Sequence, residues 1–299
     1  MRSPTAVDPA RAISLARERR SVACRLVDEM ILDRAPSLAT SRWAPWYRRL
    51  IDRMIGYQGL VDLVDQCRSC RSGAELADLI VERTALVATS TRLQRTPAAG
   101  GCILIANHPT GIADGAALYD QIRPLRRDLS MLVFHDVLKV NPAAADVFIP
   151  VEWRPRLRDA TNLLHTMAGT MQALSAGRLV VMFPSGRLAF WNGLRLRERP
   201  WKSTFVTLAL KYDVPVIPIH IAARNSWAFY ALSQISTELR DIQSIREAQN
   251  KAGTHYRITF GRPIQPCDLD GDPDAIATRL QGFVEDVLPG APDAAWNAC

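Results

Sequence analysis

The chain has 299 residues, about twice the ~150 residues of a typical domain, so its length allows one large domain with an accessory lobe. Apolar residues make up 48% and charged residues 22% of the sequence, a balance that excludes a disordered or collagen-like chain. The net charge of +7 favours an anionic partner, although a general solubility charge would give the same sum.

No segment of the sequence would carry the chain across a membrane. Residues 1–20 contain five arginines and no apolar core of the length that a signal peptide needs. No stretch approaches the ~20 consecutive apolar residues of a membrane-spanning helix. We therefore expect a cytoplasmic protein, peripheral on the cytoplasmic face of the membrane, whose six cysteines are free thiols.

Cys67 and Cys70 have the spacing of half a zinc site. No second pair of cysteines or histidines follows at finger-like spacing, and the segment is typical of a helix. We interpret both as ordinary thiols and expect no metal.

Residues 1–90 are predicted to form an N-terminal helical lobe. Apolar residues recur at helical spacing over 9–33, and a helical pattern continues over 76–90. Residues 43–55 mix tryptophan, arginine and aliphatic side chains, which suits a helix lying in a membrane interface. A helix packed on the main domain with solvated arginines is the alternative, and the sequence leaves both open.

The pattern changes after residue 90, where short apolar runs alternate with helical segments and 93–101 reads as a linker. This alternation predicts that residues 91–299 form an α/β domain, with a mostly parallel central sheet and helices on both faces. Strands are expected at 102–106, 129–134, 147–151, 179–183, 214–221 and 256–260, and helices at 115–122, 137–146, 158–175, 204–211, within 226–249 and at 274–287.

The first of these strands runs directly into Asn107-His108-Pro109, so His108 lies at the carboxyl end of a strand. In parallel sheets ligands bind at this edge. Asp114 follows six positions later, at the expected start of a helix, where its carboxylate can reach back to the imidazole. Such a pair makes the histidine a general base, whereas a structural histidine is the alternative.

No protein nucleophile accompanies this histidine. The sequence has no G-x-S-x-G elbow, no Walker loop and no G-x-G-x-x-G fingerprint. The group that His108 activates therefore belongs to the substrate, as a hydroxyl, an amine or water.

Three blocks in chain order carry a family resemblance: Asn107-His108-Pro109 with Asp114-Gly115, then Phe183-Pro184-Ser185-Gly186-Arg187, then Val214-Pro215-Val216-Ile217-Pro218. Over residues 99–266 they resemble the glycerolipid (lysophospholipid) acyltransferase superfamily, which includes the 1-acylglycerol-3-phosphate acyltransferases. Trp201-Lys202 and Ala223-Arg224-Asn225-Ser226 are similar to its hemolysin-like branch, which includes enzymes implicated in ornithine-lipid synthesis.

The resemblance implies transfer of a fatty acyl group from an acyl carrier protein or coenzyme A thioester to a lysophospholipid or aminolipid acceptor. The resemblance favours O-acyl transfer, with N-acyl transfer as the alternative. In both cases the reaction forms no acyl-enzyme and uses no cofactor. His108 would deprotonate the acceptor, and Asp114 would orient His108. Arg187 and Arg154 would hold the acceptor's phosphate or carboxylate. The other substrate-binding residues it implies are Asn107, Ser185, Gly186 and Lys202.

The sequence departs from the family pattern at two places. Five residues separate His108 from Asp114 where the commonest spacing has four, a longer spacing that the hemolysin-like branch shares. Ser185 stands where the family has a glutamate, which weakens the expectation of a glycerol-phosphate acceptor. The block that contains Arg154 matches poorly.

Two other functions compete with the transferase: a lipid-binding regulatory protein that has lost activity through Ser185, and a thioester hydrolase. The presence of both His108 and Asp114 favours an enzyme, and no basic module with stacking aromatics indicates nucleic-acid binding. Two other histidines, His165 and His220, are expected to be structural. Trp153 and Trp191 are expected to pack in the core, with the lining of an acyl groove as the alternative.

The charge excess is local. Residues 153–202 hold nine basic and two acidic residues, which equals the excess of the whole chain. Because this window contains the expected anion-binding loops, we predict a positive field at the active site that attracts an anionic membrane surface and acidic acyl carrier protein.

Overall fold

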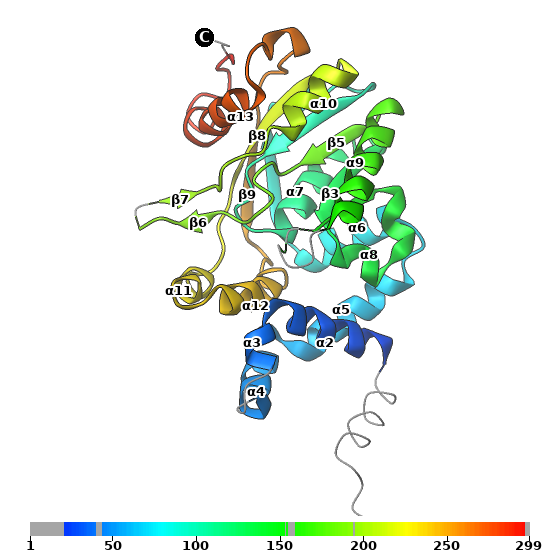
Figure 1. Ribbon diagram of the computed structural model, residues 1–299, viewed down its shortest axis with the longest axis vertical. Coiled ribbons are helices and arrows are strands. Elements are labelled where there is room, and N and C mark those ends of the chain that lie inside the picture. The colour runs from blue at the N-terminus through cyan, green and yellow to red at the C-terminus, as the bar shows by residue number, and fades with distance from the viewer. Residues whose placement is uncertain (1–20, 40–43, 153, 155–158, 194, 297–299) are drawn as a thin grey trace, which may run out of the picture.

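The computed structural model describes residues 21–39, 44–152, 154, 159–193 and 195–296. In this part of the chain seven strands form one sheet, in the order β1-β9-β8-β2-β5-β3-β4 (Figure 1). Neighbouring strands run parallel except β8 and β9, so the predicted mostly parallel α/β fold is confirmed. The strands of the sheet are β1 (Val87–Thr91), β2 (Cys102–Ala106), β3 (Leu129–Phe134), β4 (Phe148–Val151), β5 (Leu179–Met182), β8 (Val216–Ala222) and β9 (His255–Phe260).

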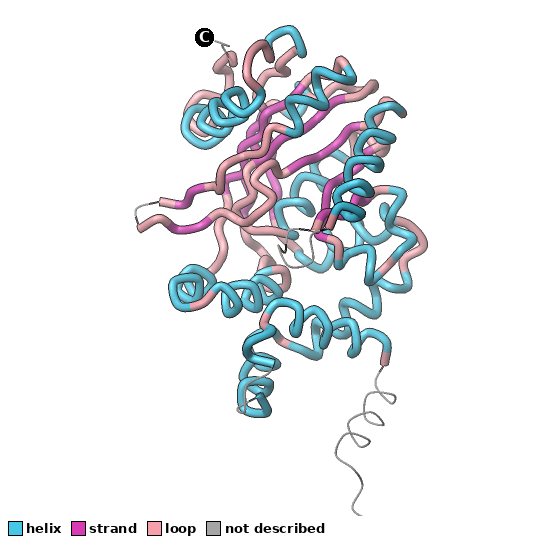
Figure 2. Tube along the Cα trace, in the orientation of Figure 1, coloured by secondary structure: helices cyan, strands magenta, loops and turns pink. Residues whose placement is uncertain are grey.

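Helices cover both faces of the sheet, and further helices lie beyond its carboxyl edge (Figure 2). The N-terminal helices are α2 (Val22–Arg34), α3 (Pro36–Ala39), α4 (Ala44–Ile55), α5 (Tyr57–Ser69) and α6 (Gly73–Thr84). The later helices are α7 (Ile112–Ile122), α8 (Asp136–Val140), α9 (Ala160–Ser175), α10 (Thr204–Tyr212), α11 (Trp227–Ile235), α12 (Thr237–Glu247) and α13 (Pro273–Gly282).

The central strand β2 is buried along its whole length, because helices cover both of its faces. Its side chains alternate between two cores, as a strand requires. Leu104 joins the cluster that α7 completes with Leu118, whereas Ile103 joins the cluster that α10 completes with Phe205. This double burial fixes the end of β2 and therefore the position of the loop that follows it.

The N-terminal helices form a third cluster with α12, in which Val27, Ile51, Ile55 and Ile242 are buried. The aliphatic side chains of α4 that suggested a membrane helix are thus partly used inside the protein, as the packed-helix alternative expects. Leu50 of the same helix is 63% exposed. Residues 9–20 of the first predicted helix and Trp43 lie outside the described residues.

The predicted helix over 76–90 is wrong beyond Thr84. Ala85 takes a left-handed conformation (φ 46°) that ends α6, and the β-branched residues after it form β1, which pairs with β9. The sequence also did not predict a hairpin between β5 and α10, which is formed by β6 (Phe190–Trp191) and β7 (Leu196–Arg197).

Two predicted helices are divided. Segment 137–146 is α8 followed by a 3-10 helix at Pro142–Asp146, and segment 226–249 is α11 and α12. Ser236 separates the latter pair, because its hydroxyl caps the first amides of α12. Segment 93–101 opens with a 3-10 helix at Leu93–Arg95.

Candidate active site

The loop of residues 107–111 joins the end of β2 to the start of α7 and presents His108 at the carboxyl edge of the sheet. Gly111 caps α7 with φ 96°, a conformation that favours glycine, and it lies against Leu188. The structure therefore confirms that His108 lies in the connection between a strand and a helix, as predicted.

His108 and Asp114 meet as the sequence predicted. The imidazole Nδ1 lies 3.0 Å from Asp114 Oδ2, and the two side chains are 19% and 0% exposed. Nδ1 is buried and has no aligned hydrogen bond among the described residues, so the contact is close but has not reached ideal hydrogen-bond geometry. Catalytic hydrogen bonds commonly tighten only when substrate is bound. The His108 ring stacks on Phe183 with 4.1 Å between ring centroids.

The Asp114 carboxylate is held by donors from its own loop. Its Oδ2 accepts from the backbone amides of Thr110 (2.8 Å) and Gly111 (2.9 Å), and its Oδ1 accepts from the Thr110 hydroxyl (2.6 Å). The Thr110 hydroxyl also lies 2.9 Å from the Tyr256 hydroxyl on β9. A fully buried carboxylate needs such partners, and they fix the face that it turns to His108.

Glu198 is a residue of the site that sequence reasoning missed. Its Oε1 accepts from the backbone amide of His108 (2.9 Å), and its Oε2 is buried without a hydrogen bond within the described residues. Burial raises the pKa of Glu198 to about 7, and the amide of His108 partly opposes that rise. Glu198 therefore binds the backbone amide of His108, while Asp114 contacts its imidazole ring.

The block that follows β5 forms a tight turn beside this loop. Gly186 has φ 59°, and its amide donates to Phe183 O (2.9 Å). The buried Ser185 hydroxyl donates to Arg187 O (2.8 Å), so Ser185 stabilises the turn. Lys202 lies alongside, since its Nζ is 3.9 Å from where a Cβ on Gly186 would be.

A cavity of about 350 Å³ opens next to His108, which we call the apolar cavity. The side chains of the N-terminal helices, α7 and β3 form its walls, and His108, Gly186 and Arg187 lie at its polar end. Most of its lining is aliphatic or aromatic, including Leu63, Leu76, Ala116, Met131 and Phe148. Its shape and lining suit an acyl chain whose reacting end meets His108.

Two arginines of the apolar cavity are available to an anion. Arg187 is exposed, and Arg199 stacks over the Phe190 ring at 4.3 Å. Neither guanidinium has a carboxylate within salt-bridge distance among the described residues. Asp241 of α12 also lines the cavity; burial raises its pKa, and the charges of Arg240, Arg34 and Arg187 oppose the rise.

Arg154 does not face the cavity, contrary to the anion-binding role expected for it. It is buried, with its guanidinium 2.7 Å from Glu152, 2.8 Å from Asp33 and 3.4 Å from Asp136. Three carboxylates already surround its charge, so it joins α2 and α8 to the loop after β4. Its partners in α2 and α8 lie far from it in sequence, which is why the sequence did not reveal them.

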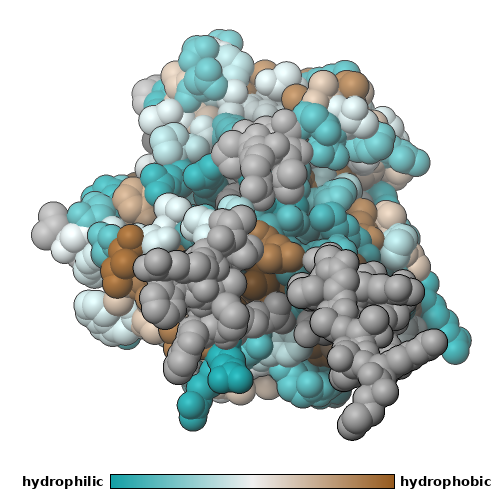
Figure 3. Space-filling view, turned by 60° about the horizontal axis from the view of Figure 1, so that its bottom comes forward, coloured by the Kyte–Doolittle hydropathy of each residue, from teal (hydrophilic) through white to brown (hydrophobic). Residues whose placement is uncertain are grey.

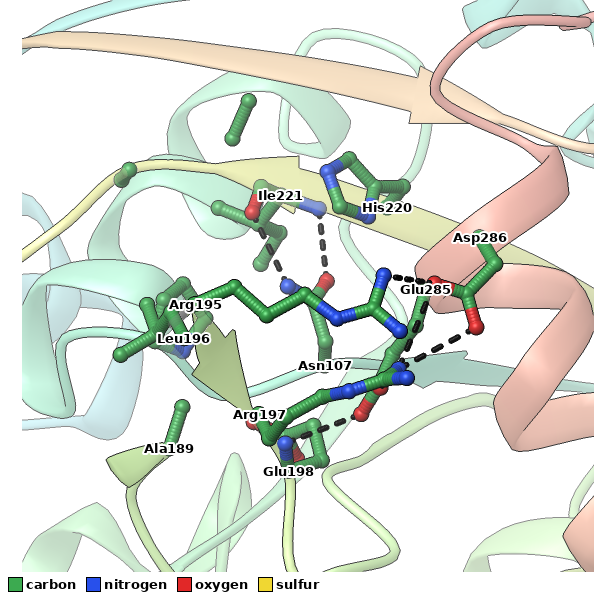
Figure 4. Close-up of a pocket in the computed structure, with 13 residues that line it drawn as sticks. Asn107, Ala189, Arg195, Leu196, Arg197, Glu198, His220, Ile221, Glu285 and Asp286 are labelled. Carbon is green, nitrogen blue, oxygen red and sulfur yellow. Dashed lines mark hydrogen bonds and ion pairs between the residues drawn. The ribbon is translucent and has the colours of Figure 1, made fainter. Parts of the chain in front are cut away.

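Asn107 is engaged by the protein as well. Its amide donates to Ile221 O (3.0 Å) and accepts from Ile221 N (2.7 Å), which ties the end of β2 to β8. It borders a second cavity of about 230 Å³ behind the loop, which we call the polar cavity (Figure 4). There Arg195 and Arg197 pair with Asp286, and Arg197 also pairs with Glu285.

The other sequence-predicted residues lie apart from the reaction. His165 is exposed on α9, and the His220 Nδ1 lies 3.0 Å from Val284 O. Burial lowers the pKa of His220, which suits a neutral structural histidine. Trp191 is 42% exposed on the hairpin and lines neither cavity, so neither core packing nor an acyl groove describes it, and Trp153 lies outside the described residues.

No metal ligand set is found in the described part of the chain, where no three histidine, cysteine or acidic residues gather suitably. Cys67 is buried, and burial raises the pKa of its thiol to about 12, which keeps it protonated. The local positive charge of 153–202 is also divided: Arg187 and Arg199 line the apolar cavity, whereas Arg195 and Arg197 are paired and Arg178 bonds backbone carbonyls.

The chain is similar to known acyltransferases. A family model described as "Acyltransferase" matches residues 87–222. The lyso-glycine lipid O-acyltransferase of Phocaeicola vulgatus is 30% identical over 206 residues, 66% of this chain and 70% of that protein. The enzyme of the same name from Bacteroides thetaiotaomicron is 25% identical over 180 residues, 58% of this chain and 64% of that protein.

A solved structure is similar as well. The 1-acyl-sn-glycerophosphate (LPA) acyltransferase PlsC of Thermotoga maritima covers 84% of this chain over 94% of its own length, with a TM-score of 0.46 and 14% identity. The region matched by the family model contains His108, Asp114 and Arg187, and the Phocaeicola vulgatus enzyme is similar over 70% of its length. This chain belongs to the glycerolipid (lysophospholipid) acyltransferase superfamily and is an acyltransferase.

Proposed function

We propose that this protein transfers a fatty acyl group from an acyl carrier protein or coenzyme A thioester to the hydroxyl of a lysolipid with an amino-acid head group. The observation that carries the proposal is the His108–Asp114 pair at the polar end of the apolar cavity. The names of the two curated relatives, which are lyso-glycine lipid O-acyltransferases, support an acceptor of this class.

In the proposed reaction, the free imidazole nitrogen of His108 takes the proton of the acceptor hydroxyl as its oxygen attacks the thioester carbonyl carbon. The C–S bond of the resulting tetrahedral intermediate breaks, an ester forms, and the thiolate leaves with the proton from the imidazolium. Asp114 orients the ring and stabilises the imidazolium. No acyl-enzyme is needed, and the thioester is a co-substrate that already activates the acyl group.

The acceptor head group is proposed to lie against Arg187 and Arg199. An amino acid attached to its acyl chain through nitrogen keeps a free carboxylate, which a guanidinium binds with two parallel hydrogen bonds. The ammonium of Lys202 lies beside Gly186, in the turn that leads into Arg187. Ser185 itself adds no negative charge there, which favours an anionic head group.

The acyl chain of the donor is proposed to fill the apolar cavity under the N-terminal helices. Within the described residues no helix is both long and apolar enough to cross a membrane. We propose peripheral association with the cytoplasmic face of a membrane, from which a lysolipid acceptor would reach Arg187.

The test is acyl transfer by the purified protein. Palmitoyl-CoA or palmitoyl acyl carrier protein is offered with a lyso-glycine lipid or with lysophosphatidic acid, and both free thiol and the acylated product are measured. We expect product from the lyso-glycine lipid and a loss of about a thousandfold in kcat for His108→Ala. His165→Ala is the matched control, since His165 is exposed on α9, and it should retain full activity.

Two results would replace the proposal with its alternatives. Thiol release that does not depend on the acceptor indicates a thioester hydrolase. Binding of the lysolipid without turnover of any donor indicates a regulatory lipid-binding protein.

A further inference from the structure

Helix α11 has an exposed apolar face. It has 9 residues, Trp227–Ile235, and none of them is charged. Trp227 is 84% exposed and Ile235 is 74% exposed, whereas Phe229 is buried. The exposed Trp227, Ala231 and Ile235 are four residues apart in turn and therefore form one stripe along the helix.

The hairpin β6–β7 continues this stripe. Trp191 of β6 is 42% exposed, and its ring lies 6.5 Å from that of Tyr230 in α11. Figure 1 shows the hairpin and α11 on the same side of the molecule. We call the four exposed side chains Trp191, Trp227, Ala231 and Ile235 the α11 surface.

The α11 surface adjoins the apolar cavity. Phe190, next to Trp191, carries the Arg199 guanidinium on its ring, and Arg199 lines the cavity. Just before α11, the Asn225 amide lies 3.5 Å from Pro109 O, in the loop that holds His108. The helix that follows, α12, contributes Asp241 and Ile245 to the cavity wall.

Positive charge surrounds the same edge. Arg187 and Arg199 have no carboxylate within salt-bridge distance among the described residues, and Arg224, just before α11, is exposed. On the face shown in Figure 3, apolar side chains gather on the side of α11 and again near the centre, with hydrophilic side chains around them. Apolar patches with a polar rim mark interaction sites, and tryptophans beside arginines are typical of membrane interfaces.

We propose that the α11 surface inserts into the headgroup region of an anionic phospholipid bilayer, so that the apolar cavity opens toward the lipid. The proposal deepens the proposed function, because it names the surface through which a membrane-borne acceptor reaches Arg187. A bilayer fits better than a second protein copy: one stripe of a 9-residue helix is far smaller than the ~800 Å² per partner of a stable interface. A bilayer also matches the neighbouring arginines in charge.

The test compares two double variants in sedimentation with vesicles of phosphatidylcholine and phosphatidylglycerol (3:1). Trp227→Ser with Ile235→Ser removes the apolar stripe. Leu210→Ser with Val287→Ser removes two exposed apolar side chains near α10 and α13, at the opposite end of the molecule (Figure 1). All four positions are exposed, so both variants should fold, which thermal melting verifies.

We expect the first variant to partition at least about tenfold more weakly than the wild type, and the second to equal the wild type. Wild-type binding should weaken with added salt and on vesicles of phosphatidylcholine alone. Equal binding by the first variant and the wild type, or an equal loss in both variants, would overturn the proposal. If the wild type is a dimer and the first variant is a monomer, the α11 surface binds a second copy of the chain instead of a bilayer.

Acyl transfer to a detergent-solubilised acceptor separates this proposal from the proposed function. The α11 variant should retain that activity, and His108→Ala should bind vesicles like the wild type. If no transfer is found but the vesicle results hold, only the proposed function fails. If transfer is found but the stripe is irrelevant to vesicles, only the docking surface fails.

Discussion

The two cavities on either side of the loop of residues 107–111 differ in the polarity of their lining and in the pairing of their charged side chains. The apolar cavity is lined mainly by hydrocarbon side chains, and within the described residues the guanidinium groups at its polar end, those of Arg187 and Arg199, have no carboxylate within salt-bridge distance. At the polar cavity four charged side chains already pair with one another: Arg195 and Arg197 with Asp286, and Arg197 also with Glu285.

This difference assigns the two sides different work. Cations without a salt-bridge partner beside apolar walls can bind the anionic group of an amphipathic ligand. Charges that already pair with each other are less available to a ligand and instead join elements of the fold. Asn107 and Glu198, which border the polar cavity, bond the backbone of β8 and of His108. We call the side of this loop that faces the apolar cavity its front and the side that faces the polar cavity its back. We therefore expect substitutions at the front to change the kinetics and substitutions at the back to change the stability of the fold.

The largest effect is expected from Asp114→Asn, which alters the group that faces the His108 ring. The amide keeps the volume and one acceptor but loses the charge that stabilises the imidazolium. We expect kcat to fall about a thousandfold with little change in KM for either substrate. Steady-state kinetics on the wild type and the variant measure this effect.

Thr110→Ser is the matched control for that variant. It keeps the hydroxyl that donates to Asp114 Oδ1 and should remain within a few-fold of the wild type. An Asp114→Asn enzyme with near-normal kcat would mean that His108 acts without Asp114.

Next in size is a change of chain-length preference caused by filling the apolar cavity. Ala116 of α7 lines it, so Ala116→Phe would occupy space that the acyl chain needs. Excluding about three methylenes at about 0.8 kcal/mol each would lower kcat/KM for long donors about fiftyfold. Short donors should be unaffected, which a series of acyl-CoA lengths measures.

The neighbouring residue provides the control. Ala117 is fully buried in the core and does not line the cavity. Ala117→Phe should overpack the core and lower the free energy of unfolding by about 1–3 kcal/mol without a change in chain-length preference. Equal destabilisation by both substitutions would show that the apolar cavity is not open space.

A smaller effect is expected from Arg187→Ala, because the acceptor would lose one charge-assisted contact. We expect its KM to rise about tenfold at constant kcat, with partial recovery in Arg187→Lys, which keeps the charge but not the fork. Arg195→Ala, on the polar cavity, is the control and should leave KM unchanged. A rise in KM with Arg195→Ala but not with Arg187→Ala would reverse the roles of the two cavities.

The fold was predictable where burial was complete. Strands β2 and β3 match their predicted bounds at both ends, since runs of apolar residues between polar loops leave little choice. β1 was missed because it is an edge strand whose five residues alternate between exposed and half-buried, so no apolar run marks it. Only its pairing with β9, more than 160 residues away, makes it a strand.

The site was predictable where its residues are neighbours in sequence. His108 and Asp114 belong to one loop and helix start, so their contact followed from spacing. Glu198 bonds the amide of a residue 90 positions earlier, and no motif marks it. The failure at Arg154 has the same origin, because Asp33 and Asp136 neutralise it from distant elements.

The smallest kinetic effect, and the sharpest test of the back of the loop, is expected from Glu198→Gln. The glutamine oxygen can still accept from the His108 amide, so kcat should stay within a few-fold of the wild type. Glu198→Ala leaves that amide without a partner and should cost about 1–3 kcal/mol of stability. Activity and thermal melting of both variants measure this contrast.

The pH dependence of stability follows from the pKa of Glu198, which burial raises from 4.5 to about 7 in the folded protein. The folded state binds this proton more tightly than the unfolded state, so the stabilisation is complete below pH 4.5 and is lost as the pH rises to about 7. Above that pH the buried charge costs about 3 kcal/mol at most. Glu198→Gln removes this cost, so its melting temperature should exceed that of the wild type at pH 8 and approach it at pH 5. A variant less stable than the wild type at pH 8 would show that the Glu198 charge stabilises the loop, and that the back of the loop contributes more than a hydrogen bond.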